Sequence, residues 1–283
     1  MRIAHLSDSH IRDAADVHAF ARQLDRVVAG AADHLVISGD LLDRWRPRLL
    51  RAALDALDSR GLLDPSRTTI IHGNHDLTSS GAHPRSRADL PRLVLRSWDP
   101  PPIVRSRRKR FYAAIGRRAP DVASLAPFAK DLGGVTIASI DTVPLPWTPI
   151  RITHGRVQMR HGVGCVRGDQ IDWLRRTLPP GKPALLVLHH YPLAVAPLHW
   201  GRKGTFEILM EIPEADRRKL WSAAQACGVR LVLCGHVHRA RLEWHDGIAV
   251  GLQGQSGAEW AGRSIGWYEV GDRGVRMTLE RTG

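Results

Sequence analysis

The sequence predicts an α/β fold built around a mostly parallel sheet. Short apolar stretches typical of buried strands alternate with segments whose apolar residues recur at the spacing of a helix. Several of these stretches also end in similar polar residues, which places them at one edge of a sheet. The chain has 283 residues, 43% of them hydrophobic, and shows no internal repeat or low-complexity linker. We therefore expect one domain over residues 1–283.

The first third of the chain shows the alternation most clearly. Residues 2–7 (RIAHLS), 34–38 (HLVIS) and 68–72 (TTIIH) are predicted to be strands. Two helices are predicted between them from the apolar residues Phe20, Leu24, Val27 and Val28, and Leu49, Leu50, Ala53, Leu54 and Leu57. The pattern lapses at about residues 77–110, where Pro84, Pro91 and Pro100 to Pro102 break regular elements. We expect a basic insert or lid there.

The rest of the chain continues the pattern with longer interruptions. Strands are predicted at residues 111–115 (FYAAI), 135–140 (VTIASI), 184–188 (ALLVL) and 230–234 (RLVLC), and helices at residues 170–178 and 217–227. Residues 141–168 and the polar stretch after residue 190 are expected to be irregular. Three shorter strands are predicted around residues 241–245, 265–270 and 274–280.

Charge is the most unusual feature of the composition. The net charge is +13, and nine Lys and Arg residues against two Asp lie between Gly81 and Arg110. This segment is interpreted either as a solvated surface loop or as an anion-attracting lid. No apolar stretch is long enough to span a membrane, and residues 1–10 do not resemble a secretory signal, so we expect a cytoplasmic protein with no membrane partner. The three cysteines show no pairing pattern, and no disulfide is expected.

Potential metal ligands follow five of the predicted strands. They are Asp8-Ser9-His10, Gly39-Asp40 with Asp43-Arg44, Gly73-Asn74-His75-Asp76, His189-His190, and Gly235-His236-Val237-His238. Asp and His supply the oxygen and nitrogen ligands that divalent metals take, and a carboxylate has two oxygens with which to bridge two ions. One such pair would be ordinary polar surface, whereas five at five strand ends indicate a metal site. The glycines at 39, 73 and 235 are expected to make the sharp turns that aim these side chains.

The ordered motifs DSH, GDxxDR, GNHD, HH and GHxH resemble those of the calcineurin-like metallophosphoesterase superfamily over residues 8–238. The resemblance implies a four-layer α/β/β/α sandwich and two divalent metal ions, drawn from Mn, Fe, Zn or Co. By the family pattern, Asp8, His10 and His238 would bind one metal and Asn74, His189 and His236 the other, with Asp40 bridging them. His189 is preferred to His190 because the first residue after the strand usually takes that place.

The same resemblance implies roles for three further residues. His75 would stabilise the transition state or protonate the leaving oxygen, and Asp43 would be its carboxylate partner. Arg44 would contact phosphate with its planar fork, although an ordinary surface arginine explains it equally well. Aromatic residues in the surrounding loops are candidates for the walls of a substrate pocket: Trp147, His154, Tyr191, His199, Trp200 and Trp260.

The expected function is hydrolysis of a phosphodiester or phosphomonoester of a small molecule, with a nucleotide as one candidate, through attack by hydroxide held between two cations. A nuclease of the same mechanism, acting on DNA or RNA, is the alternative. The basic segment favours the nuclease. The sequence shows no appended DNA-binding region, which disfavours it. An inactive scaffold on this fold is disfavoured because no ligand position is lost. The oligomeric state is left open.

Overall fold

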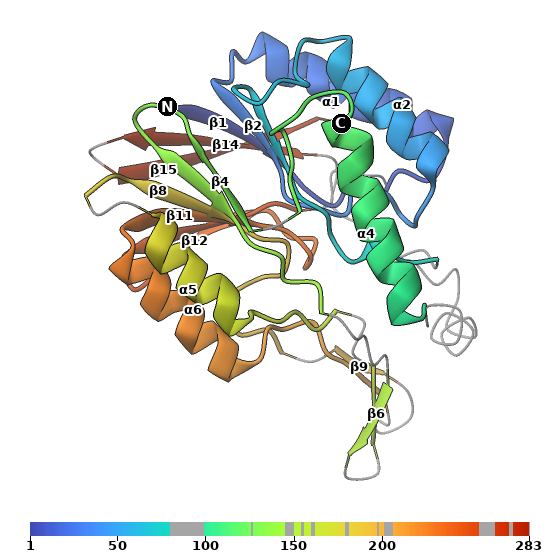
Figure 1. The fold of residues 1–283 in the computed structure, drawn as a ribbon, viewed down its shortest axis with the longest axis vertical. Helices are drawn as coiled ribbons and strands as arrows, with labels where there is room; N and C mark the ends of the chain where they lie inside the picture. Colours follow the sequence, from blue (N-terminus) through green and yellow to red (C-terminus); the bar gives the residue numbers. More distant parts are fainter. Residues whose placement is uncertain are drawn as a thin grey trace.

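The computed structural model describes residues 1–79, 99–125, 127–144, 150–153, 156–159, 162–178, 181–196, 198–200, 206–254, 264–271 and 274–282. Figure 1 shows two sheets facing each other, with α1, α2 and α4 on one outer face and α5 and α6 on the other. This arrangement confirms the α/β prediction and its four layers.

The first sheet has five strands in the order β15-β14-β1-β2-β3. The three predicted strands of the first third form its parallel part: β1 (Arg2–Leu6), β2 (His34–Ile37) and β3 (Thr68–Ile70). The chain returns at its end to add β14 (Ser264–Gly271) and β15 (Gly274–Arg281) as antiparallel strands. Helices α1 (Ala14–Ala29) and α2 (Pro47–Asp58) are the two predicted crossovers.

The second sheet has six strands in the order β12-β13-β11-β8-β5-β4. Its members are β4 (Phe128–Asp131), β5 (Thr136–Ser139), β8 (Ala184–Val187), β11 (Val229–Cys234), β12 (Arg241–His245) and β13 (Ile248–Leu252). Helices α5 (Gly168–Thr177) and α6 (Glu214–Ala226) cover its outer face. The predictions missed β4 and β13.

Three apolar cores separate the four layers. In β2, Leu35 and Ile37 pack toward the helices while Val36 packs toward the other sheet. The same alternation in β8 sends Leu186 toward its helices and Leu185 toward the central core. Because neighbouring residues of a strand point to opposite faces and both faces are covered, the parallel strands are buried on both faces and rich in apolar residues. This is why short apolar runs predicted them.

Helix α4 (Pro101–Gly116) contradicts two predictions. Residues 111–115 are helical rather than a strand, and Pro101 and Pro102 begin a helix rather than break one. Proline fits the first turn of a helix because the backbone N–H groups there have no intrahelical partner. Val104, Phe111 and Ile115 are buried on the inner face of α4, so the apolar run FYAAI serves a helix.

Two arginines of the expected basic insert are held in ion pairs. Arg107 pairs with Asp99 at 2.8 Å and donates to the Leu77 carbonyl, while Arg108 pairs with Asp141 at 2.7 Å. Their side chains are only 15% and 11% exposed, so these two arginines are neither lid nor solvated loop. Residues 80–98, with the other arginines of the expected lid, lie outside the described residues.

A smaller four-stranded sheet occupies stretches predicted to be irregular. Its order is β6-β7-β10-β9, from β6 (Ile150–Thr153), β7 (Arg156–Met159), β9 (Leu198–Trp200) and β10 (Phe206–Ile208), and it lies at one end of the sandwich (Figure 1). The three cysteines are free, as predicted. Among the described helices, none is both long enough and apolar enough to cross a bilayer.

Candidate metal centre

The polar residues that follow β1, β2 and β11 leave their strands through left-handed backbone turns. Asp8, His10, Asp40, His236 and His238 have φ of 53°, 43°, 49°, 76° and 53°. Residues other than glycine rarely adopt this conformation, and where the surrounding structure maintains it, it marks functional sites. The turns bend the chain back over the sheet edge, so side chains from distant segments meet there.

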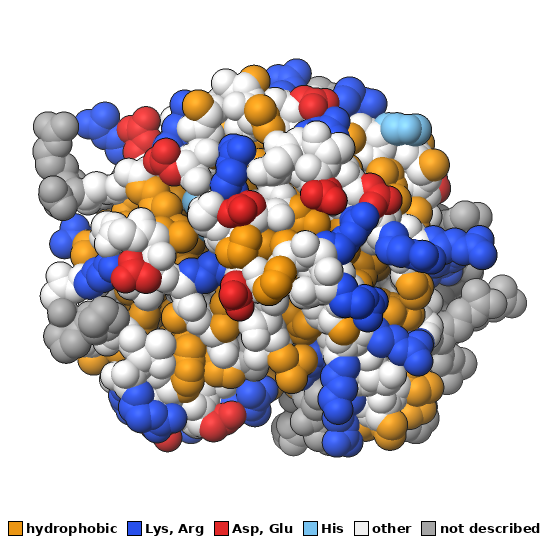
Figure 2. Space-filling view, turned by 45° about the horizontal axis from the view of Figure 1, so that its top comes forward, with side chains coloured by type: hydrophobic (Ala, Val, Ile, Leu, Met, Phe, Trp, Pro, Cys, Tyr) orange, Lys and Arg blue, Asp and Glu red, His pale blue; other side chains and the backbone are white. Residues whose placement is uncertain are grey.

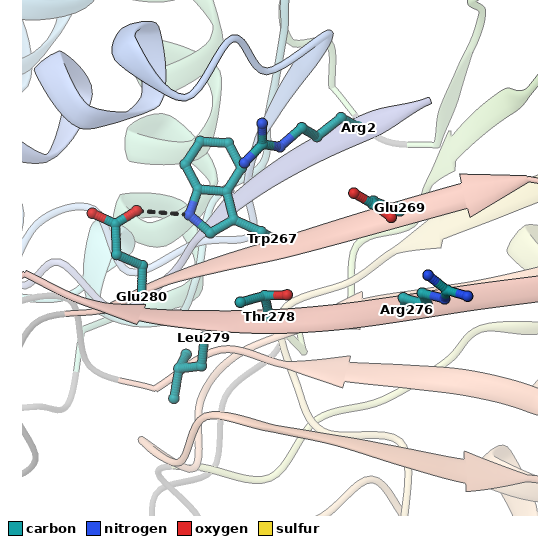
Figure 3. A pocket seen from close by; sticks show the side chains of 7 residues that line it. All are labelled: Arg2, Trp267, Glu269, Arg276, Thr278, Leu279 and Glu280. Atoms are coloured by element: carbon teal, nitrogen blue, oxygen red, sulfur yellow. Dashed lines mark hydrogen bonds between the residues drawn. The ribbon is translucent and has the colours of Figure 1, made fainter.

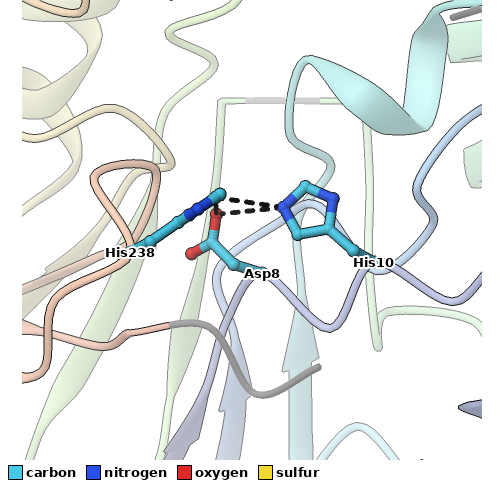
Figure 4. A group of neighbouring side chains, drawn as sticks. All are labelled: Asp8, His10 and His238. Carbon is cyan, nitrogen blue, oxygen red and sulfur yellow. Dashed lines mark hydrogen bonds and ion pairs between the residues drawn. The ribbon is translucent and has the colours of Figure 1, made fainter. Parts of the chain in front are cut away.

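One group of potential ligands consists of Asp8, His10 and His238, whose ligand atoms all lie within 4.8 Å of one another. His10 Nε2 lies 3.1 Å from His238 Nε2, and His238 Nε2 lies 3.3 Å from Asp8 Oδ1. Figure 4 shows the two imidazoles and the carboxylate pointing toward one another. The structure therefore brings together all three residues predicted for the first metal.

A second group consists of Asp40, His189 and His236, with ligand atoms again within 4.8 Å of one another. Asn74 joins it, because its Oδ1 lies 3.0 Å from His189 Nε2. His189 Nδ1 donates to the Ser38 carbonyl at 2.9 Å, which leaves Nε2 as the nitrogen that can bind a metal. A hydrogen bond of this kind fixes the tautomer and the orientation of a ligating imidazole.

Asp40 belongs to the second group and also faces the first. Its Oδ2 is 3.3 Å from His189 Nε2 and 3.9 Å from His10 Nε2, so one oxygen faces an imidazole of each group. Oδ2 is buried and accepts no hydrogen bond from the described residues, whereas Oδ1 accepts one from the His75 backbone N–H at 2.8 Å. A buried anionic oxygen of this kind needs a cation nearby, which fits a bridging ligand.

His190 packs beside this cluster, with its ring centroid 4.4 Å from that of His236. Its Nδ1 lies 2.8 Å from Thr142 Oγ1, and its ring belongs to neither group of ligands. The placement is consistent with the preference for His189.

The glycines of the motifs act differently from the prediction at two of three positions. Only Gly39, with φ of 106°, needs the left-handed freedom of glycine. A Cβ on Gly73 would lie 2.5 Å from the Asp40 backbone nitrogen, and one on Gly235 would lie 2.8 Å from Ser7 Cβ and overlap the Asp8 carboxylate. Gly73 and Gly235 are therefore required because two segments touch, not because the chain turns.

The carboxylates attract positive charge to the centre. Asp8 and Asp40 are fully buried, which alone would raise their pKa, but His238 outweighs burial and lowers the pKa of the Asp8 carboxyl, and His189 does the same for Asp40. Burial opposes charge on His189 as well, yet Asp40 raises the pKa of that imidazole to about 9. Burial lowers the pKa of His236 to about 3. The donor set and its charge fit divalent cations.

The three residues predicted to act on the substrate lie at the edge of this cluster. His75 is half-buried, and its ring lies 5.0 Å from that of His10. Its Nδ1 lies 3.2 Å from the main-chain carbonyl of Asp43, so the contact involves the backbone of Asp43 rather than the expected carboxylate. Arg44 is exposed, and no ion pair among the described residues includes it.

Asp76 is a residue that the sequence analysis quoted but left without a role. Its Oδ1 accepts from the Leu42 N–H at 2.8 Å and its Oδ2 from the Gly73 N–H at 2.9 Å, so it joins the loops after β2 and β3. Burial, and then Asp40, raise the pKa of Asp76 to about 7. Its place next to His75 was the available signal, but a carboxylate that binds backbone N–H groups leaves no pattern in sequence.

A hollow elsewhere on the surface does not compete with this centre. It has a volume of about 570 Å³ and is lined by Arg2, Trp267, Glu269, Arg276, Thr278, Leu279 and Glu280 (Figure 3). Arg2 begins β1, whereas Asp8 follows its other end. Two arginines face two glutamates in the hollow, so it offers no excess positive charge to a phosphate.

Of the proposed pocket aromatics, only Tyr191 has a described side chain. It is 2% exposed and bonds to Glu243. His199 and Trp200 lie in β9 without described side chains, and Trp147, His154 and Trp260 lie outside the described residues.

Two adjacent groups of carboxylate and imidazole side chains lie at the carboxyl edge of an α/β sandwich. This arrangement is typical of enzymes that use metal ions. The sequence model of the calcineurin-like phosphoesterases matches residues 1–240, and the chain belongs to that family. It is therefore a phosphoric ester hydrolase that uses divalent metal ions.

Relatives agree with this assignment. A protein of Rhodococcus erythropolis named probable cyclic nucleotide phosphodiesterase is 24% identical over 88% of this chain and 69% of its own length. A Synechococcus protein of the same name is 38% identical over 28% of this chain and 29% of its own length. The crystal structure of a dimetal phosphatase from Danio rerio covers 100% of this chain and 99% of that protein, with a TM-score of 0.60 and 11% identity, which supports the fold alone.

Proposed function

We propose that the chain hydrolyses a phosphodiester of a small molecule at a binuclear metal centre. Asp8, His10 and His238 would hold one divalent cation, and Asn74, His189 and His236 the other. The observation that carries the proposal is Asp40, whose Oδ2 faces an imidazole of each group at 3.3 Å and 3.9 Å. When bound, two cations lower the pKa of water and neutralise charge on phosphoryl oxygens.

His75 is the proposed acid catalyst. Its backbone N–H donates to Asp40 at 2.8 Å, which fixes its distance from the bridging carboxylate. Donation from Nδ1–H to the Asp43 carbonyl leaves Nε2 to hold the proton that goes to the leaving oxygen. His75 is half-buried whereas His10 and His189 are buried, so it is the imidazole of these three that substrate can reach. Arg44, which is exposed, would bind a nonbridging phosphate oxygen.

The small substrate is supported by two observations. The Rhodococcus relative, which matches 88% of this chain, carries the name of a cyclic nucleotide phosphodiesterase. Arg107 and Arg108 of the basic segment are held in ion pairs, so they are not available to follow a nucleic-acid backbone. The face drawn in Figure 2 carries both acidic and basic side chains, and the basic ones gather toward its lower right.

Asp40→Asn tests the metal centre, since it keeps the size of the side chain and removes the bridging charge. We expect metal content measured by elemental analysis to fall below two per chain and hydrolysis of bis-p-nitrophenyl phosphate nearly to vanish. Asp55→Asn, at a side chain that is 61% exposed, is the control. Two tightly bound metals and normal turnover in Asp40→Asn would overturn the assignment.

The substrate is tested with the wild-type protein on bis-p-nitrophenyl phosphate, p-nitrophenyl phosphate, cyclic nucleotides and single-stranded DNA. The proposal expects the highest kcat/KM on a small diester. A higher rate on DNA, with binding that weakens steeply as salt rises, would replace it by the nuclease.

A further inference from the structure

A network of buried and half-buried polar side chains joins the two sheets beside the proposed metal centre. Asp141 follows β5 of the six-stranded sheet, and its Oδ1 lies 3.3 Å from Nε2 of His72, which follows β3 of the five-stranded sheet. Arg108 of α4 binds Asp141 Oδ2 at 2.7 Å, and Tyr112 of the same helix lies 2.7 Å from His72 Nδ1. The side chains of His72 and Asp141 are 1% and 4% exposed, so this contact is hidden from water.

Each side of the network leads to one of the proposed ligands. On one side, His72 is followed directly by Gly73 and Asn74. On the other side, Thr142, the neighbour of Asp141, accepts the His190 N–H at 3.2 Å, and His190 is the neighbour of His189.

Asn74 and His189 then meet each other, with 3.0 Å between Oδ1 and Nε2. Asp141 is therefore placed to set how the loop after β3 faces the loop after β8. A shift of one loop against the other would separate these two ligands.

Lys130 forms a second connection between the same two sheets, at the opposite end of β3. It lies on β4, and its Nζ donates to the Thr68 carbonyl at 2.6 Å and to the Val122 carbonyl at 3.0 Å. Thr68 begins β3, whereas His72 follows its end. Lys130 thus offers a matched case of a half-buried charge that joins the sheets but lies away from the metal ligands.

We propose that Asp141 is a positioning residue that holds Asn74 against His189 and thereby sets the affinity of the second metal site. The inference rests on the proposed function, since it assumes that these two residues bind a metal together. Groups that orient metal ligands typically change affinity by about 10-fold to 100-fold when they are removed. Asp141→Asn should weaken one of two metal sites by that factor and leave the other within about threefold.

The test is titration of the metal-free protein with Mn²⁺ by calorimetry, with thermal unfolding measured alongside. Asp141→Asn leaves Arg108 without its partner and is expected to lower Tm, so Lys130→Met is the control for lost stability. Support requires that Lys130→Met lowers Tm by a similar amount but keeps both Mn²⁺ affinities within about threefold. Equal effects of the two variants on both sites, or no effect of Asp141→Asn, would overturn the proposal.

A further variant covers the case in which Asp141→Asn does not fold. Arg108→Met combined with Asp141→Asn removes both charges and leaves neither unpaired, so it should fold and should still show the weakened site. Normal affinity at both sites in this variant would refute the positioning role. Failure of the proposed function looks different, because the wild type itself would then bind fewer than two Mn²⁺ ions per chain.

Discussion

Gly73→Ala should damage the metal centre, although it adds a single methyl group. The new Cβ would lie 2.5 Å from the Asp40 backbone nitrogen and 2.7 Å from Asp40 Cγ, and it would overlap Oδ1. A side chain alone could rotate away from such a contact, but the backbone nitrogen cannot. The loops after β2 and β3 would therefore have to separate.

The size of that movement sets the expected effect. Nonbonded heavy atoms settle at about 3.5 Å, so a contact of 2.5 Å requires a separation of roughly 1 Å. Overpacking of this kind costs about 1–3 kcal/mol of the free energy of unfolding. A displacement of about 1 Å at a catalytic group costs on the order of 10²-fold in rate. We expect a folded Gly73→Ala protein with kcat/KM lowered about 100-fold and with weakened metal binding.

Gly168→Ala is the matched control. Gly168 begins α5, and a Cβ there would meet nothing within 4 Å. Urea unfolding, metal analysis and kcat/KM on a chromogenic diester should be measured for both variants. If Gly73→Ala keeps two metals and activity within about threefold of wild type, the claim that Gly73 is required for close approach to Asp40 is wrong.

Three further predictions concern catalysis, packing and pH. His75→Asn should keep the metal content and lower kcat by about 10²-fold to 10⁴-fold; metal loss with normal kcat per metal would make His75 a ligand instead. Arg108→Ser should lower the free energy of unfolding by about 3–5 kcal/mol, because it removes the guanidinium that pairs with the buried Asp141 carboxylate at 2.7 Å, whereas exposed Lys109→Ser should change it by less than about 0.5 kcal/mol. Equal urea midpoints for the two would contradict the buried pair. Burial lowers the pKa of His34 from 6.5 to about 4. Between these two pH values the unfolded chain binds a proton at His34 and the folded chain does not, so the free energy of unfolding falls as pH falls. From pH 6.5 to pH 5 this loss is about 2 kcal/mol, and His34→Gln should remove it in urea titrations; an unchanged pH dependence would refute the assignment.

The parallel part of the fold could be predicted because burial on both faces leaves a direct record in sequence. Stretches such as HLVIS and ALLVL consist mostly of apolar residues, and each ends where the chain turns toward the metal centre. The small sheet of β6, β7, β9 and β10 left no such record. Its strands have three or four residues each, too few to show a period.

Helix α4 was missed for a different reason. An apolar run of five residues fits a strand or one face of a helix, and only the ten residues before it decide between them. These residues are rich in arginine, which suggested a solvated segment. Two of the arginines are instead half-buried in ion pairs, and the partner of Arg108 is Asp141, which is far away in the sequence. Long-range pairing of this kind cannot be inferred from the local pattern of charge.

The motifs identified the proposed ligands, but they did not identify the residues that hold these ligands in place. Asp8 and Asp40 could be named because acids and histidines follow five predicted strands in the order of the family's motifs. What holds them in place is less visible: the Asp76 carboxylate binds the Leu42 and Gly73 N–H groups, and Gly73 and Gly235 leave room for the carboxylates to approach. Backbone N–H groups and absent Cβ atoms carry no side-chain signature. The motifs in this chain therefore predict which side chains would bind a metal, while the three-dimensional contacts determine whether those side chains remain close enough to do so.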